Sequence, residues 1–168
     1  MCCAANASRT SSCLRHDAGV ASPKVGQPAP DFELVGTHGP FKLSEQRGRK
    51  VLLLFYPGDD TPVCTRQFCS YRDESDKVEG LDAVVVGISA QSEESHAAFT
   101  AKHGLNVPLL ADEGGKVAKQ YGAWRPVVGT QRAVFGVDEQ GVVRHVHKHT
   151  LGLDFQDADE LSTALASF

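Results

Sequence analysis

The sequence predicts an α/β domain with a central, mostly parallel sheet, an antiparallel hairpin at one edge and flanking helices. Two apolar runs, residues 51–56 and 83–89, have the length and continuity of strands that are buried on both faces. Segments with helical signals follow both runs, and strands that alternate with helices form parallel sheets. Residues 133–137 and 142–146 are strand candidates joined by a short turn, which predicts the antiparallel hairpin.

The length and composition describe one domain with a short leader. The chain has 168 residues and a formal net charge of -4. A chain of this size buries a core without disulfide bonds to stabilise it. Residues 1–23 are rich in Ser, Ala and Cys and have no hydrophobic periodicity. We therefore expect a disordered leader at residues 1–23 and the folded domain at residues 24–168.

Charge, hydropathy and cysteine content exclude several classes of protein. The acidic balance provides no basic face for nucleic acid. No apolar run reaches the ~20 residues of a membrane span, and the N-terminus lacks the apolar segment of a secretory signal. The number of cysteines, five, is odd, and Cys2, Cys3 and Cys13 lie in the leader, where we expect them to have no functional role. A reducing compartment, the cytoplasm, is expected, with an organelle as the alternative if the Ser- and Arg-containing leader is a transit peptide.

The strand candidates are bounded by turn residues. The run at 51–56 stops at Pro57-Gly58, and the first two strands are separated by a turn at residues 36–39, which predicts a small hairpin at the start of the domain. In chain order, the expected strands are a short strand that ends the segment 25–34, followed by residues 41–43, 51–56, 83–89, 108–112, 133–137 and 142–146.

The helix candidates are defined by their ends. Ser92 predicts a helix start and Gly104 the end of the same helix. Asp157 with Glu160 three residues later has the spacing of a capping box at the start of the last helix. In chain order, the expected helices are residues 62–78, 92–104, 116–121 and a final helix from residue 157.

One cysteine lies where a helix start favours its reactive form. Thr61 followed by Pro62 reads as a helix start, because a Thr hydroxyl accepts a hydrogen bond from a free backbone N–H and proline fits the first helical position. Cys64 then lies in the first turn, where free N–H groups and the helix dipole stabilise a thiolate relative to a thiol. A thiolate is a nucleophile. The alternative is that Cys64 is a buried structural thiol.

Cys69 lies five residues after Cys64. In an intact helix this spacing separates the Cα atoms by about 8 to 9 Å, whereas a disulfide needs them within about 7 Å. If the two cysteines react together, the first turns of the helix must therefore unwind. A zinc pair and two unrelated cysteines are the alternatives, but structural zinc sites usually have a second pair of ligands, and no second pair is visible here.

At these residues the sequence resembles the peroxiredoxins of the AhpC/TSA type, and specifically the peroxiredoxin Q or bacterioferritin comigratory protein type, which uses two cysteines of one chain. The family pattern Pro-x-x-x-Thr-x-x-Cys is matched by Pro57, Thr61 and Cys64, and the second cysteine of the Q type is matched by Cys69. The resemblance runs from about Lys24 to the C-terminus and implies a thioredoxin-like fold.

The resemblance also implies a role for each matched residue. Cys64 would attack a peroxide oxygen and become a sulfenic acid, Thr61 would hold the peroxide or the thiolate, and Pro57 would shield the site from water. Arg132, which stands where the family has its arginine, would stabilise the thiolate and the charge on the departing oxygen. Cys69 would resolve the sulfenic acid to an intramolecular disulfide.

The implied function is a thiol-dependent peroxidase that reduces hydrogen peroxide and organic hydroperoxides. It needs no cofactor and no metal, acts as a monomer, and is reduced by thioredoxin or a glutaredoxin-like protein. A redox-switched sensor or chaperone-like binding protein that uses the same disulfide is the alternative. A general thiol–disulfide oxidoreductase would usually carry Cys-x-x-Cys, which this chain lacks.

Some residues near the motif differ from the family or carry extra charge. Gln67 stands where the family usually has glutamate, so we expect a looser orientation of Arg132. Asp59 and Asp60 are expected to be exposed, where solvent screens their effect on a nearby thiolate.

Three histidines alternate near the C-terminus. His145, His147 and His149 would share one face of a strand. We interpret them as an exposed edge strand, with a metal-binding patch as the alternative.

Overall fold

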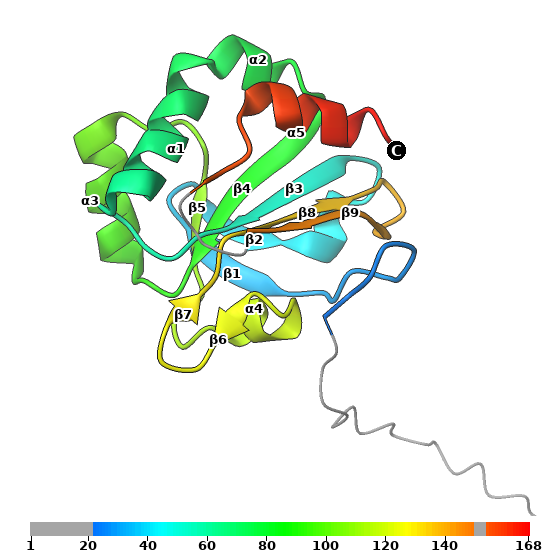
Figure 1. Ribbon diagram of the computed structural model, residues 1–168, viewed down its shortest axis with the longest axis horizontal. Coiled ribbons are helices and arrows are strands. Elements are labelled where there is room, and N and C mark those ends of the chain that lie inside the picture. The colour runs from blue at the N-terminus through cyan, green and yellow to red at the C-terminus, as the bar shows by residue number, and fades with distance from the viewer. Residues whose placement is uncertain (1–21, 150–153) are drawn as a thin grey trace, which may run out of the picture.

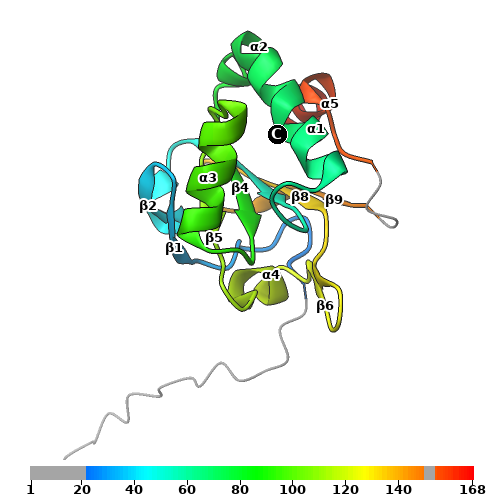
Figure 2. The same ribbon diagram turned by 90° about the vertical axis from the view of Figure 1, so that its left-hand side faces the viewer.

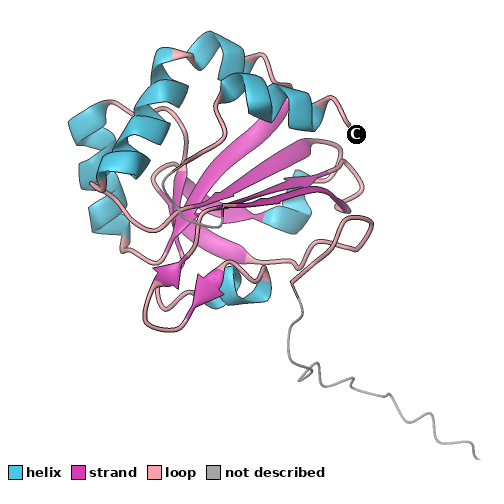
Figure 3. Cartoon of the chain, viewed as in Figure 1, coloured by secondary structure: helices cyan, strands magenta, loops and turns pink. Residues whose placement is uncertain are grey.

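The computed structural model describes residues 22–149 and 154–168, and in it helices cover both faces of one seven-stranded sheet (Figures 1 and 3). The strands of this sheet are β1 (Glu33–Gly36), β2 (Gly39–Lys42), β3 (Lys50–Phe55), β4 (Ala83–Ser89), β5 (Leu109–Ala111), β8 (Ala133–Val137) and β9 (Val143–Lys148). The α-helices are α1 (Pro62–Asp73), α2 (Ser75–Glu79), α3 (Glu93–His103), α4 (Lys116–Gln120) and α5 (Ala158–Leu165). A short 3-10 helix covers Leu43–Gln46, and β6 (Trp124–Arg125) pairs with β7 (Gly129–Thr130) in a separate ribbon.

The centre of the sheet is parallel and its edges are antiparallel. The strand order is β2-β1-β5-β4-β3-β8-β9. β3 pairs in parallel with β4, and β4 with β5. The β8–β9 hairpin lies against β3 at one edge, as predicted, and the β1–β2 hairpin joins the other edge through β5. The α/β architecture with an antiparallel hairpin edge is therefore confirmed.

β3 lies inside the sheet between β4 and β8, and both of its faces are buried against apolar side chains. Alternate residues of the run belong to two different hydrophobic clusters, as the pleat of a strand requires. Leu52 and Leu54 pack in the cluster that also holds residues of α1, α3 and α5. Leu53 and Phe55 pack in the cluster on the side of α4. Figure 2 shows α1, α3 and α5 on one side of the sheet and α4 on the other.

The predicted helix ends are confirmed where capping chemistry is local. The Thr61, Ser92 and Asp157 side chains each accept a hydrogen bond from a backbone N–H of the first turn, and Asp157 completes a capping box with Glu160. Gly104 ends α3 in the left-handed conformation with φ 61°.

The helix predicted for residues 62–78 is interrupted. α1 ends at Asp73 and α2 begins at Ser75, because Glu74 leaves the helical conformation with φ -106° and ψ 34°. Val78 at the end of α2 is buried. The break changes the direction of the chain after the segment that carries both cysteines.

Two features of the sequence lie partly or wholly outside the described residues. The expected leader, residues 1–23, is described only at Ser22 and Pro23, so Cys2, Cys3 and Cys13 are not among the described residues.

Within the described part of the chain, no helix combines the length and apolar character that crossing a membrane requires.

Candidate active site

The loop after β3 and the first turn of α1 form the centre of the site. Tyr56 continues the line of β3, and its backbone N–H donates to the carbonyl of Ile88 at 3.1 Å. Thr61 is the N-cap residue directly before α1. Its hydroxyl donates to the Gly58 carbonyl at 3.3 Å and accepts from the Cys64 backbone N–H at 3.4 Å. The predicted cap therefore fixes the backbone at the cysteine itself.

Cys64 is fully buried and meets a guanidinium group. Arg132 Nη2 donates to Cys64 Sγ at 3.1 Å, and the arginine is only 2% exposed. Arg132 reaches this position because β8 pairs with β3 so that Ala133 lies opposite Phe55, the last residue of β3. A buried cation at hydrogen-bond distance stabilises a thiolate over a neutral thiol. The start of α1 adds the positive end of the helix dipole, which favours the thiolate as well.

Gln67 holds the arginine in place through its neutral amide. Arg132 Nη1 donates to Gln67 Oε1, while Gln67 Nε2 donates to the Tyr71 hydroxyl at 3.0 Å. The Tyr71 hydroxyl in turn donates to the Gln156 carbonyl. Burial raises the pKa of Tyr71, so its hydroxyl remains a proton donor at neutral pH. The amide oxygen of Gln67 therefore takes the place of a carboxylate as an acceptor for Arg132, and the looser orientation of the arginine stays a prediction.

The expectation that Asp59 is exposed is wrong, whereas Asp60 is exposed as expected. The Asp59 carboxylate accepts hydrogen bonds from Tyr56 Oη at 2.8 Å, Ser95 Oγ at 2.7 Å and His96 Nδ1 at 2.8 Å. Burial raises the pKa of Asp59, but these three hydrogen bonds outweigh it and leave the pKa below its usual value. Asp59 thereby fastens the active-site loop to α3.

Replacing Asp59 by asparagine is expected to lower the free energy of unfolding by about 1–3 kcal/mol at pH 7, because a buried, charge-assisted network loses its acceptor. The pKa of Asp59 is lowered by folding. Its contribution is therefore present above the unfolded value of about 3.9 and is lost as the pH falls through the lower folded value. Urea unfolding of wild type and variant at pH 7, 5 and 3 measures this, and the difference between the two should be smaller at pH 3 than at pH 7.

The exposed Asp82→Asn variant is the matched control for this prediction and should unfold like wild type at each pH. A stability difference between wild type and Asp59→Asn that is as large at pH 3 as at pH 7 would contradict the assigned role of the carboxylate.

The structure brings together three of the five predicted site residues. Thr61, Cys64 and Arg132 are in contact, as described above. Pro57 lies in the same loop but is exposed. Cys69 lies in α1 with Cys64 and is half-buried, and its Sγ is 4.0 Å from Nδ1 of His103 in α3. Both described cysteines are free thiols.

The three alternating histidines share a face of the edge strand β9 and its continuation. The His145 and His147 ring centroids are 6.5 Å apart, and those of His147 and His149 are 4.4 Å apart. His147 is exposed and the other two are half-buried. Among residues 22–149 and 154–168, no group of three or more His, Cys, Asp or Glu residues is arranged to hold a metal ion.

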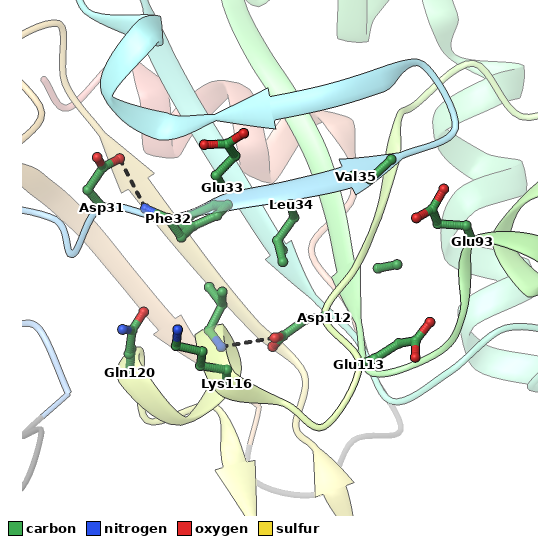
Figure 4. Close-up of a pocket in the computed structure, with 12 residues that line it drawn as sticks. Asp31, Phe32, Glu33, Leu34, Val35, Glu93, Asp112, Glu113, Lys116 and Gln120 are labelled. Carbon is green, nitrogen blue, oxygen red and sulfur yellow. Dashed lines mark hydrogen bonds between the residues drawn. The ribbon is translucent and has the colours of Figure 1, made fainter.

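Cavities of the described surface separate into one beside the arginine and others remote from it. A hollow of about 240 Å³ is lined by Arg132, Trp124, Lys148 and His149 among others. A larger pocket of about 500 Å³, drawn in Figure 4, contains none of the predicted site residues. The Asp112 carboxylate in this pocket already accepts hydrogen bonds from the backbone N–H groups of Val117 and Ala118, at 3.0 and 2.8 Å.

Sequence reasoning missed several residues of the site. Tyr71 and His96 carry no motif, and the Gln156 carbonyl and the Asp59 carboxylate that they contact are distant in the chain. The only signal for Tyr71 is its spacing of four residues from Gln67, which places the two side chains on one face of a helix. His103 is 34 residues from Cys69, and no local pattern indicates their contact.

Comparison with known proteins agrees with this geometry. Residues 25–146 match the AhpC/TSA family. The chain is 40% identical over 126 residues to Peroxiredoxin Bcp of Bacillus subtilis, covering 70% of this chain and 80% of that protein. It is 41% identical over 139 residues to Peroxiredoxin Q, chloroplastic, of Sedum lineare, covering 81% of this chain and 75% of the relative.

A solved structure agrees in fold as well as in sequence. The crystal structure of Peroxidoxin BcpB from Mycobacterium tuberculosis superposes with a TM-score of 0.74 at 32% identity, covering 86% of this chain and 96% of that one. The thioredoxin-like fold expected from the resemblance is confirmed by this neighbour. Since the family match spans most of the sequence and the two relatives near 40% identity are covered over 80% and 75% of their lengths, the chain belongs to the AhpC/TSA family.

Proposed function

We propose that this protein is a thiol-dependent peroxidase that reduces hydrogen peroxide and organic hydroperoxides at Cys64. The observation that carries the proposal is the contact of 3.1 Å between Arg132 Nη2 and Cys64 Sγ, in the first turn of a capped helix. Both the guanidinium and the helix start favour the thiolate, which is the form that attacks a peroxide. Kinship with Peroxiredoxin Bcp and Peroxiredoxin Q supports this function over a redox-switched binding protein.

In the first step the Cys64 thiolate attacks one peroxide oxygen and the O–O bond breaks. The sulfur gains that oxygen as a sulfenic acid, and the other oxygen leaves as water or an alcohol after protonation. Arg132 stabilises the negative charge that moves from the sulfur to the departing oxygen. Thr61 orients the peroxide with its hydroxyl, and Pro57 limits the access of water to the loop.

In the second step Cys69 attacks the sulfenic acid and forms an intramolecular disulfide. Both residues belong to α1, so their Cα atoms are about 8 to 9 Å apart. Their side chains leave the helix in directions that differ by about 140° around its axis. The first turns of α1 must therefore unwind. Phe68, which is 1% exposed and packs on Tyr56 with ring centroids 4.8 Å apart, has to leave the core in the process.

A protein dithiol then reduces the disulfide and completes the cycle. We propose thioredoxin or a glutaredoxin-like protein as this partner and a monomer as the working form. The compartment is a reducing one, either the cytoplasm or an organelle like the chloroplast in the name of the Sedum lineare relative.

The Cys69→Ser variant tests the two-step cycle. With thioredoxin, thioredoxin reductase and NADPH, this variant is expected to consume about one peroxide per chain and then stop, because the sulfenic acid has no resolving thiol. Adding a small thiol should restore turnover. Replacing Cys2, Cys3 and Cys13 together by serine is the matched control and should leave turnover unchanged. Sustained, thioredoxin-dependent turnover of Cys69→Ser at the wild-type rate would reject the resolving role of Cys69.

A further inference from the structure

Cys69 faces a histidine that is itself paired with a carboxylate. Cys69 Sγ lies 4.0 Å from His103 Nδ1, and the other ring nitrogen, Nε2, lies 3.4 Å from Asp60 Oδ1. The three residues come from three segments: α1, the last residue of α3, and the loop between β3 and α1. This cluster lies outside the Cys64–Arg132 contact, and the two-step cycle does not use His103 or Asp60.

The order of the contacts fixes which nitrogen can accept a proton. A carboxylate is an acceptor only, so the nitrogen that faces Asp60, Nε2, carries the hydrogen in the neutral ring. Nδ1 is then left with a free lone pair, and this lone pair is on the side of the Cys69 thiol. A thiol, an imidazole and an orienting carboxylate in this sequence form the arrangement that activates a cysteine nucleophile.

Several contacts hold the imidazole in place. The His103 ring is 20% exposed and packs edge-on against Phe99, with ring centroids 5.1 Å apart. Arg72 Nη1 donates to the His103 carbonyl at 2.5 Å, which ties the end of α3 to α1. Asp60 adopts the left-handed conformation with φ 56°, a region of the backbone map that non-glycine residues occupy only rarely. With the backbone in this conformation, the Asp60 carboxylate lies beside the His103 ring.

The charged groups around His103 are of both signs. Lys102 Nζ lies 2.6 Å from Asp60 Oδ1 and keeps that carboxylate ionised, since hydrogen bonds from Lys102 lower the pKa of Asp60. Arg72, which is paired with Asp73 at 2.6 Å, lies on the Cys69 side. A cation near the sulfur favours the thiolate once the proton has moved to the imidazole.

We propose that His103, oriented by Asp60, is the general base that deprotonates Cys69 for its attack on the Cys64 sulfenic acid. This inference rests on the proposed function. The Cys69 proton moves to His103 Nδ1 while α1 is folded, and the thiolate then attacks Cys64 Sγ as the helix unwinds. The new S–S bond forms as the S–O bond breaks, so Cys69 is oxidised, Cys64 is reduced, and the departing hydroxide takes one proton and leaves as water. His103 is catalytic in this step and Asp60 is a positioning residue.

A single-turnover experiment separates this step from peroxide reduction. The reduced full-length chain is mixed with one equivalent of hydrogen peroxide and quenched at intervals with a sulfenic acid trap. Intact mass spectrometry then gives the rates of sulfenic acid and disulfide formation between pH 6 and 9.5. The variants are His103→Gln and Asp60→Asn, and the matched control is His38→Gln, which changes an exposed histidine in the turn between β1 and β2.

The His103→Gln variant is expected to form the sulfenic acid at the wild-type rate and the disulfide more slowly. Without a base, a thiol must lose its proton to water before it can attack, so a slowing of about 10- to 100-fold is expected at pH 7. The disulfide rate of this variant should rise with pH and approach the wild-type rate at the alkaline end of the range. Asp60→Asn should show a smaller slowing of the same step, and His38→Gln should show none.

Two results would overturn the role of His103. One is a disulfide rate in His103→Gln equal to that of wild type at every pH. The other is a slowing of equal size at every pH, since a change in helix unwinding, unlike loss of a base, is not relieved when the thiol ionises by itself. If wild type forms a sulfenic acid but no disulfide between Cys64 and Cys69, the resolving role of Cys69 fails and this inference fails with it. The wild-type time course alone therefore distinguishes failure of the resolving role of Cys69 from failure of the role of His103.

Discussion

Replacing Cys64 by serine is expected to abolish peroxide consumption, with a loss of more than about 10³-fold. Serine has nearly the same size, but its hydroxyl does not ionise at neutral pH and attacks peroxide oxygen poorly. The buried site should tolerate it, because the Arg132 guanidinium that donates to Sγ at 3.1 Å can donate to a hydroxyl oxygen as well. Loss of activity would then reflect lost chemistry and not a lost fold.

The measurement for Cys64→Ser is the rate of peroxide loss with a small dithiol as reductant, which bypasses the protein partner. The variant should show the same thermal unfolding midpoint as wild type to within a few degrees. Cys69→Ser, assayed with the same dithiol, is the matched control and should remain active. Appreciable residual turnover in Cys64→Ser would contradict the assignment of the nucleophile.

Replacing Arg132 by methionine is expected to lower the rate constant for sulfenic acid formation by about 10²- to 10³-fold, the usual effect of removing one donor that stabilises developing charge. The substitution keeps an apolar side chain of similar length in a site that is 2% exposed, but it removes the cation from Cys64. Arg132→Lys should recover part of the activity only, because an ammonium cannot donate to Cys64 and Gln67 in the planar geometry of a guanidinium.

Two readouts check the Arg132 prediction. Stopped-flow oxidation by hydrogen peroxide reports the reaction itself, and alkylation of the Cys64 thiol by iodoacetamide reports the fraction of thiolate without any peroxide. The rate of oxidation and the rate of alkylation should both fall in Arg132→Met, while both rates in the exposed Arg49→Met control should match wild type. An Arg132→Met variant that is oxidised within about threefold of the wild-type rate would contradict the electrostatic role of the arginine.

Local chemistry explains which parts of the structure were predictable. The starts of α1 and α5 follow from capping residues next to the helices they begin, so Thr61 and Asp157 could be read directly. The run at residues 51–56, which supplies most of β3, is apolar at every position, which is enough to place it inside the sheet with both faces buried. The contact of Arg132 with Cys64 required the family pattern, because the pairing of β8 with β3 that creates it is a long-range event.

The residues that could not be predicted depend on packing between distant segments. An aspartate in a Gly-Asp-Asp turn is ordinarily solvated, and only the arrival of His96 and Ser95 on α3 makes burial of Asp59 favourable. The same docking of α3 brings His103 to Cys69. Thus Cys64 and the capping residue Thr61 could be predicted from one stretch of sequence, whereas the groups around Cys69 could not.

The most direct test of the account is steady-state NADPH oxidation by the purified full-length protein with hydrogen peroxide, thioredoxin and thioredoxin reductase. We expect sustained turnover with one NADPH consumed per peroxide, and a disulfide between Cys64 and Cys69 when NADPH is exhausted. Absence of peroxide consumption by the wild-type protein, even with a small dithiol and with organic hydroperoxides, would contradict it.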